Sequence, residues 1–276
     1  MPHPNRMSWR TLLRSLILRI GRPNFLASRY YDEAEMLLLQ AMPKNMIDVA
    51  IDVGASIGAY SWLLHDVSRK VICIDADAGQ ASALRVSAVL TSMTVLTGAA
   101  SAQSSGDIEF HWCPGRRPLS RVCDEGASTE GMLRTQVRRL SLDADVLPLV
   151  EDGRNVDFIK IDVEGHEHEV VRGCERLLHL HHPVFLIEIE HRHNPAYGLT
   201  FDLLASRGYE CFVSRNGNLR RFDPEWLIAN QGSADLVERL ARRGAGQNAY
   251  LNNFIFIHEQ SRLGPWFAQR LASEAA

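Results

Sequence analysis

Two hydrophobic periods alternate along most of the chain. Short apolar runs typical of buried strands are separated by longer segments whose apolar residues recur at helical spacing. The apolar runs are residues 46–53, 71–74, 93–96, 108–112, 136–140, 156–161, 183–189 and 254–257. The helical segments are residues 7–20, 32–42, 80–90, 167–180 and 201–207, with a further helix from Ser61. Strands that alternate with helices predict an α/β fold with a doubly wound, mostly parallel sheet.

The end of the chain departs from this alternation. Residues 209–214 and 219–222 form two predicted strands joined by Asn216-Gly217, a pair typical of tight hairpin turns. A last apolar strand follows at residues 254–257. We therefore expect one antiparallel strand at an edge of the sheet.

The same patterns predict the organisation of the chain. We expect an N-terminal helical extension at residues 1–43, one main domain at 44–260 and a short tail at 261–276. Residues 113–135 break the pattern with Gly, Pro, Ser and Thr, and residues 223–247 form a predicted helical insertion. The first of these segments is long enough to contact an acceptor substrate, and Arg116, Arg117 and Arg121 could bind an anionic group there. The alternative is a solvated, arginine-rich loop.

The N-terminal helical segment is amphipathic and basic. Its apolar residues recur at helical spacing with Arg10, Arg14 and Arg19 between them. Such a helix can lie on an anionic membrane surface, which would make the protein membrane-peripheral. The alternative, which we favour, is a helix that packs on the domain or forms a dimer contact.

Composition narrows the classes of function. The formal net charge is −3, so bulk electrostatics do not favour a nucleic-acid binder. Five scattered cysteines without a CxxC pair favour reduced thiols and a cytoplasmic protein, and provide no zinc signature. No apolar run has the length that a membrane-spanning helix needs.

Residues 51–60 carry the clearest functional pattern. A predicted strand ends at Asp52-Val53, a turn contains Gly54 and Gly58, and a helix follows. This arrangement directs backbone N–H groups and the positive end of a helix at a ligand. About 20 residues further on, a second strand ends in Asp75, where nucleotide-binding α/β folds hold ribose hydroxyls. A nucleoside-containing cofactor therefore explains the pattern better than a tight turn with a solvated aspartate.

Parallel strands bring their carboxyl ends to one edge of the sheet, where ligands bind. We expect the following residues at this edge: Gly54, Asp75, Ala99, Asp162 and Glu188, with His191 and His193 just beyond. The two histidines are candidate general bases, and the two later acids are candidate catalytic groups.

Each of these acids and histidines has a plainer interpretation. Asp162 and Glu164 could simply favour a helix start, and the histidines could be surface or packing residues. Asp162 with Glu188 could hold a divalent cation through oxygen ligands, but we do not favour a metal. His166 and His168 face different sides of a predicted helix and are not a metal pair.

Four segments in order resemble the FkbM-type family of S-adenosylmethionine (AdoMet)-dependent methyltransferases. They are residues 52–58, 141–143, 158–167 and 183–188. The resemblance implies a class I methyltransferase fold with a Rossmann-like seven-stranded sheet, AdoMet as the cofactor, and O-methylation of a hydroxyl on a sugar, glycan or secondary metabolite.

Positions carry over from the resemblance residue by residue. The methionine side of AdoMet would be lined by Asp52, Gly54, Ala55, Ser56 and Gly58. Asp75 would hold the ribose, with Ala76 beside it, Ala99 would lie near the adenine, and Asp162 would face the cofactor or the acceptor. The chain departs from the family at three places: Ser56 replaces the usual Asn, Asp75-Ala76 replaces Glu-Pro, and His166 replaces a frequent Ala.

The chemistry fits this arrangement, because the sulfonium methyl is already activated and an attacking alcohol needs mainly positioning and a proton acceptor. His191, His193 or Asp162 could accept the proton, and the sequence does not choose between them. Two other functions remain open. One is a non-catalytic domain that binds AdoMet or a glycan. The other is a nicotinamide-dependent reductase, which the missing third glycine of the turn and the absent Tyr-x-x-x-Lys pair disfavour.

Overall fold

A computed structural model describes residues 9–20, 34–112, 120–122, 132–150, 153–191, 193, 196–215, 218–222, 231 and 251–271. Most of the segment predicted to contact the acceptor and of the predicted helical insertion lies outside these residues. The main-sheet strands are β1 (Ile47–Val53), β2 (Ser68–Asp75), β3 (Met93–Thr97), β8 (Val156–Ile161), β9 (Val184–Glu188), β10 (Tyr209–Arg215), β11 (Asn218–Arg221) and β12 (Asn253–His258). The helices are α1 (Trp9–Ile20), α3 (Ala34–Gln40), α4 (Ala59–Val67), α5 (Ala78–Ser87), α6 (Glu167–Arg172), α7 (Glu175–His181), α8 (Gly198–Ser206) and α11 (Gly264–Ala268).

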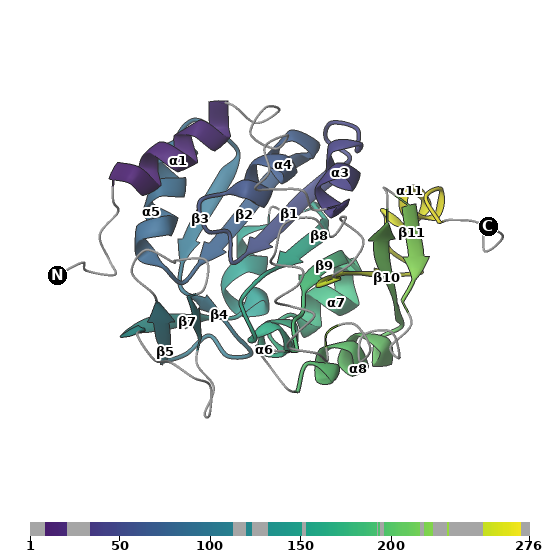
Figure 1. Cartoon of the computed structure of the whole chain (residues 1–276). Coiled ribbons are helices and arrows are strands. Elements are labelled where there is room, and N and C mark those ends of the chain that lie inside the picture. The colour runs from purple at the N-terminus through teal and green to yellow at the C-terminus, as the bar shows by residue number, and fades with distance from the viewer. Residues whose placement is uncertain are drawn as a thin grey trace.

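The main sheet has eight strands in the order β11-β10-β12-β9-β8-β1-β2-β3 (Figure 1). The pairs from β9 to β3 are all parallel, which confirms the predicted doubly wound α/β class. The strand order reverses between β1 and β8, so the crevice expected at such a switch point lies beside the end of β1.

The expected antiparallel edge is confirmed, because the hairpin and the last strand pair antiparallel at one end of the sheet. The main sheet has eight strands, one more than the seven that the resemblance implies. Strand β12 lies inside the sheet, antiparallel to both β9 and β10, and the edge strand is β11 of the hairpin. The apolar residues of β12 explain the inside position, because Phe254 and Phe256 pack in the core on one face and Ile255 packs on the other. A strand that is apolar on both faces is stabilised by neighbours on both sides.

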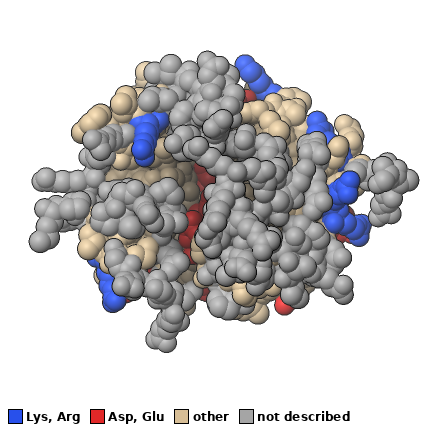
Figure 2. Space-filling view, viewed as in Figure 1, with Lys and Arg blue, Asp and Glu red and all other residues tan. Residues whose placement is uncertain are grey.

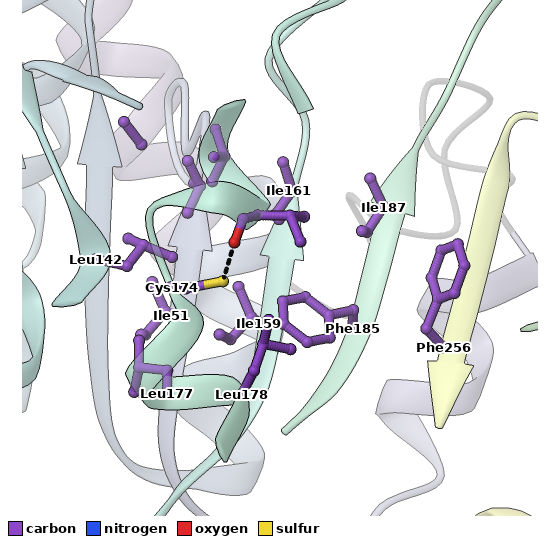
Figure 3. Packing of buried hydrophobic residues seen from close by; sticks show 14 of the residues in the cluster. Ile51, Leu142, Ile159, Ile161, Cys174, Leu177, Leu178, Phe185, Ile187 and Phe256 are labelled. Carbon is purple, nitrogen blue, oxygen red and sulfur yellow. Dashed lines mark hydrogen bonds between the residues drawn. The ribbon is translucent and has the colours of Figure 1, made fainter. Parts of the chain in front are cut away.

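Two hydrophobic cores cover the two faces of this sheet. Helices α3, α4, α5 and α11 contribute to the core on one face, and α6, α7 and α8 to the core on the other (Figure 1). Figure 3 shows the second core, where Cys174 lies among Ile51, Leu142, Ile159 and Leu177 and its thiol donates to the backbone carbonyl of Val171 at 3.0 Å. Both layers hold β1 and β8 in place, and these two strands carry most of the site.

A second, four-stranded sheet was not predicted as a separate unit. It contains β4 (Ala99–Ala100), β7 (Leu133–Leu140), β5 (Asp107–Trp112) and β6 (Arg121–Val122), in that order. Its small core of Ala99, Phe110, Trp112 and Val122 packs against Ala76, just after β2. This sheet therefore forms a wall beside the carboxyl end of the main sheet.

The helix predicted over residues 167–180 is two helices, α6 and α7, because Gly173 interrupts it. A side chain on Gly173 would place its Cβ 2.2 Å from the backbone oxygen of Ser101. The segment around residues 141–143 locks this junction: the hydroxyl of Ser141 donates to the Gly173 carbonyl at 3.0 Å. The Asp143 carboxylate accepts the backbone N–H groups of Arg176 and Leu177 at 2.8 and 3.0 Å, so it stabilises the start of α7.

The N-terminal helix packs on the domain, which is the arrangement we favoured. The Ser15 hydroxyl is fully buried, donates to the Ile57 carbonyl at 3.0 Å and lies 2.7 Å from the Ser87 hydroxyl on α5. The other side of α1 exposes Trp9 and Leu13. Within the described residues, no helix has the length and apolar character to cross a membrane.

Candidate active site

A cavity of about 410 Å³ opens where the strands end, within the usual range for small-molecule sites. Its lining contains most of the predicted site residues: Asp52, Gly54, Ala55, Ser56, Asp75, Ala76, Ala99, Asp162 and Glu188. Seen from the side of Figure 1, acidic side chains lie in a hollow near the middle of the surface (Figure 2). Residues that are far apart in the sequence therefore meet at one place, as the strand-end argument predicted.

The glycine turn is shaped by a close backbone approach. Gly54 has a φ of 81°, and a Cβ there would lie 1.8 Å from the backbone oxygen of Asp162. Only glycine fits both conditions. Gly58, with a φ of 97°, immediately precedes α4, and a Cβ there would meet the Leu84 side chain at 2.6 Å. The two glycines thus let the turn pack closely against the segment after β8 and against α5.

Asp75 is held rigidly by the same turn. Its two carboxylate oxygens accept the backbone N–H groups of Ser56 at 2.6 Å and of Asp77 at 2.7 Å. Burial raises the pKa of Asp75 to about 7, and the neighbouring charge of Asp77 adds to the shift. Ser56 itself has a left-handed φ of 51°, which explains why Asn is usual there: Asn tolerates this conformation better than most residues.

The wall beside Asp75 is apolar. Ala76, Ala99, Phe110 and Val122 line this part of the cavity, and Phe110 and Val122 come from the second sheet. A flat aromatic base fits a slot of this chemistry, with polar groups confined to its ends. Phe110 and Val122 were not predicted as site residues, because nothing in their local sequence indicates that the second sheet folds against β2.

A buried lysine, Lys160, also lines the cavity and was not predicted as a site residue. The Lys160 side chain is 1 % exposed, and its ammonium lies 3.8 Å from a carboxylate oxygen of Asp162 and 3.2 Å from Asn253 Oδ1. It also lies 4.9 Å from the ring centroid of Tyr60. A usable signal was present: Lys160 is the only lysine within a predicted strand core of a chain whose other cations are almost all arginine.

Asp52 on β1 is fully buried and lies beside Lys160 of β8 in the parallel pairing of the two strands. Its carboxylate accepts the Ser61 hydroxyl at 2.5 Å. Burial raises the pKa of Asp52 to about 6, and the Ser61 hydrogen bond and the charge of Lys160 both oppose that shift. Lys160 therefore offsets the cost of two carboxylates, those of Asp52 and Asp162, in a partly dry site.

The segments that follow β8 and β9 contact each other through His193 and Glu164. His193 Nδ1 lies 2.6 Å from a carboxylate oxygen of Glu164, and its Nε2 lies 3.9 Å from one of Glu190. Glu164 lines the cavity, and His193 lies behind it. Glu188, also in the lining, accepts the side-chain amide of Asn252 at 2.7 Å. The predicted candidates Glu188 and His193 thus both lie at the site, one in its lining and one just outside.

A match to a family model decides which proteins this chain is related to. The model described as the methyltransferase FkbM domain matches residues 52–211, more than half of the chain. The chain belongs to the FkbM methyltransferase family. The matched region includes the glycine turn, strand β8 with Lys160, and the ends of β8 and β9 with Glu164 and Glu188.

Solved structures resemble this FkbM-family chain at low identity. The FkbM methyltransferase of Methylobacillus flagellatus is 15 % identical, with a TM-score of 0.44 over 92 % of this chain. This chain spans only 56 % of that protein. An O-methyltransferase of Bacillus cereus is 14 % identical, with a TM-score of 0.43 over 90 % of each chain. No curated protein matches the chain in sequence.

Two histidines of this FkbM-family chain lie differently from expectation. His191 is exposed, does not line the cavity and packs edge-on against Tyr197 at a ring-centroid distance of 5.2 Å. The structure therefore does not bring this predicted base to the site. His166 does line the cavity, is buried, and lies 3.3 Å from the Ser101 hydroxyl. Among the described residues, no group of three His, Cys, Asp or Glu side chains could hold a metal ion.

Proposed function

We propose that this protein is an AdoMet-dependent O-methyltransferase that modifies a hydroxyl on a sugar, glycan or secondary metabolite. One observation carries the cofactor assignment: the Asp75 carboxylate, fixed by two backbone N–H groups, faces a cavity that begins at the Gly54 turn. A rigid buried carboxylate at the end of the second strand is the group that accepts two ribose hydroxyls.

The residues present fit the three parts of AdoMet. The amino-acid end would contact the backbone of the Gly54 turn and the carboxylate of Asp52, both of which line the cavity. Asp75 would hold the ribose. The slot formed by Ala76, Ala99 and Phe110 would take the adenine.

When bound, the cofactor supplies an activated methyl group on a sulfonium. The protein must then hold an acceptor oxygen in line with that group, exclude competing water and accept one proton. The acidic side of the cavity offers Asp162, Glu164 and Glu188, whose oxygens accept hydrogen bonds from hydroxyl groups. Hydroxyl groups of an alcohol or sugar can donate to these oxygens, which supports an alcohol as the acceptor.

Calorimetric titration with AdoMet, S-adenosylhomocysteine (AdoHcy) and NADPH tests the cofactor assignment. We expect micromolar binding of both methionine nucleosides and a loss of at least tenfold in affinity in Asp75→Asn. Asp107→Asn, at the exposed start of β5, is the matched control and should bind normally. Binding of NADPH alone would instead support the reductase. Tight AdoMet binding without transfer to any hydroxyl compound in an acceptor panel would support the non-catalytic domain.

A further inference from the structure

We propose that Glu164 is the proton acceptor of the reaction and that His193 is its positioning residue. This inference rests on the proposed O-methyl transfer and assigns the base, which the sequence left open. The pair connects the ends of two strands, because Glu164 follows β8 and His193 follows β9. Their contact of 2.6 Å joins a cavity-lining carboxylate to a largely buried imidazole behind it.

The backbone of both loops is shaped around this contact. Glu164 has a left-handed φ of 56°, an uncommon conformation for a residue with a side chain. The next residue, Gly165, has a φ of 109°, and a Cβ there would lie 2.9 Å from the backbone oxygen of His193. Local strain of this kind persists where the surrounding structure determines a functional geometry. The strain here directs Glu164 toward the cavity while its loop lies against His193.

The other four acids of the described lining are committed to different partners. Asp75 is held by two backbone N–H groups and Asp52 by the Ser61 hydroxyl. Asp162 lies 3.8 Å from the buried Lys160 ammonium. Glu188 accepts the amide of Asn252. Glu164 differs, because its partner is the imidazole of His193, which reaches it from the segment after another strand.

The second side of His193 is also acidic. Its Nε2 lies 3.9 Å from a carboxylate oxygen of Glu190, which is 3 % exposed and accepts the Asn252 amide at 3.2 Å. His193 therefore lies between two carboxylates, an arrangement that fixes the ring and holds Glu164 in one orientation.

The proposed step balances in atoms and electrons. A lone pair of the acceptor oxygen forms the new C–O bond, and the C–S bond breaks with its electron pair remaining on sulfur. The hydroxyl proton moves to the Glu164 carboxylate and returns to solvent as the product leaves. His193 keeps the carboxylate aimed at the oxygen and exchanges no atoms with the acceptor.

Steady-state kinetics on four variants test this assignment, using AdoMet and whichever members of a monosaccharide and small-alcohol panel the wild-type protein methylates. Glu164→Gln should lower kcat by 100-fold or more, within the range for loss of a general base, while the calorimetric affinity for AdoHcy changes less than twofold. His193→Gln should lower kcat about tenfold and alter its pH profile. The double variant should be no slower than Glu164→Gln, because the two residues act as one unit. Glu164→Asp should recover part of the rate.

Two surface variants serve as controls: Glu210→Gln and His179→Gln, both exposed and neither in the cavity lining, should leave kcat unchanged. A Glu164→Gln protein that retains at least a third of wild-type kcat would overturn the assignment while leaving the O-methyltransferase intact. Additive effects in the double variant would show that His193 acts apart from Glu164 and would overturn the pair. A wild-type protein that binds AdoMet but methylates no panel member would overturn both the proposed function and this inference.

Discussion

The two halves of the cavity are built in different ways. The half that we assign to the cofactor, from Gly54 to Asp75, is built on a glycine turn packed against the backbone of Asp162 and on a carboxylate held by backbone N–H groups. The half that we assign to the acceptor consists of side chains at the ends of β8 and β9, where Lys160 lies beside Asp162 and Glu164 contacts His193. A shared cofactor needs a constant backbone cradle, whereas an acceptor-specific pocket can change residue by residue. The family pattern therefore names residues for the first half and leaves the base of the second half open.

Gly54→Ala should have the largest effect on stability and cofactor binding, because it places a side chain inside the tightly packed glycine turn. The new Cβ would lie 1.8 Å from the backbone oxygen of Asp162, at a φ of 81°. We expect a loss of about 4 kcal/mol or more in the free energy of unfolding, measured by urea denaturation, and no AdoHcy binding.

A matched control for this change is Gly153→Ala. Gly153 has nearly the same φ, 80°, but no atom of the described residues lies within 4 Å of the place that a Cβ would take there. It should lose only about 1 kcal/mol, the cost of a left-handed alanine. Equal losses in the two variants would mean that the close approach to Asp162 has no energetic importance.

Lys160→Met should have the next largest effect, on the acceptor half. The change leaves the carboxylates of Asp52 and Asp162 without their buried cation. We expect a loss of about 3 kcal/mol in the free energy of unfolding and a further rise in the pKa of Asp52 above 6. Lys70→Met removes a solvent-exposed hydrogen bond to the Leu149 carbonyl and should cost less than about 1 kcal/mol. Similar losses in both would contradict the role of Lys160 as a counter-ion.

The raised pKa of Asp75 makes the free energy of unfolding depend on pH. Burial raises the pKa of Asp75 to about 7 from an ordinary 3.8, so the folded protein binds this proton more tightly than the unfolded chain. The free energy of unfolding should therefore fall as pH rises from about 4 to about 7, with Asp52 and Glu167 contributing in the same direction.

Cofactor binding should change in the opposite direction, because the charged Asp75 is the better acceptor for ribose hydroxyls. AdoHcy affinity, followed by calorimetry, should rise severalfold between pH 6 and pH 8. Asp75→Asn should flatten both the stability and the binding profile. An unchanged binding profile in that variant would assign the pH dependence to another group.

The N-terminal helix should show the smallest effect. Its inner side is committed to the domain through Ser15, while Trp9 and Leu13 are 69 % and 48 % exposed on a helix that contains no acidic residue. We propose a weak contact of this face with anionic membranes. Replacing Trp9 and Leu13 together with Gln should reduce flotation with anionic vesicles and change the free energy of unfolding by less than about 0.5 kcal/mol. Unchanged flotation would remove the membrane contact.

The sequence by itself determined the α/β alternation, the glycine turn and the acid at the end of the second strand. These are local features: a strand, a turn and a helix start are each specified by neighbouring residues and their periodicity. Glycine at position 54 and Asp75 could be predicted for the same reason, since a turn and a strand end fix their places. Parallel pairing then brought Asp162 and Glu188 to the same edge, as expected.

Only the tertiary structure decided the rest. The inside position of β12, the wall from the second sheet, and the Glu164–His193 contact all join residues that local periodicity treats as independent. The segment at residues 141–143 illustrates the limit, because Ser141 and Asp143 match the family yet stabilise the start of α7 and the junction before it. His191 and His193 are nearly adjacent, and packing turns one to solvent and the other to Glu164. The direction of a side chain and the pairing of strands depend on the free energy of contacts between residues far apart in sequence. Local hydrophobic periodicity carries no information about those contacts.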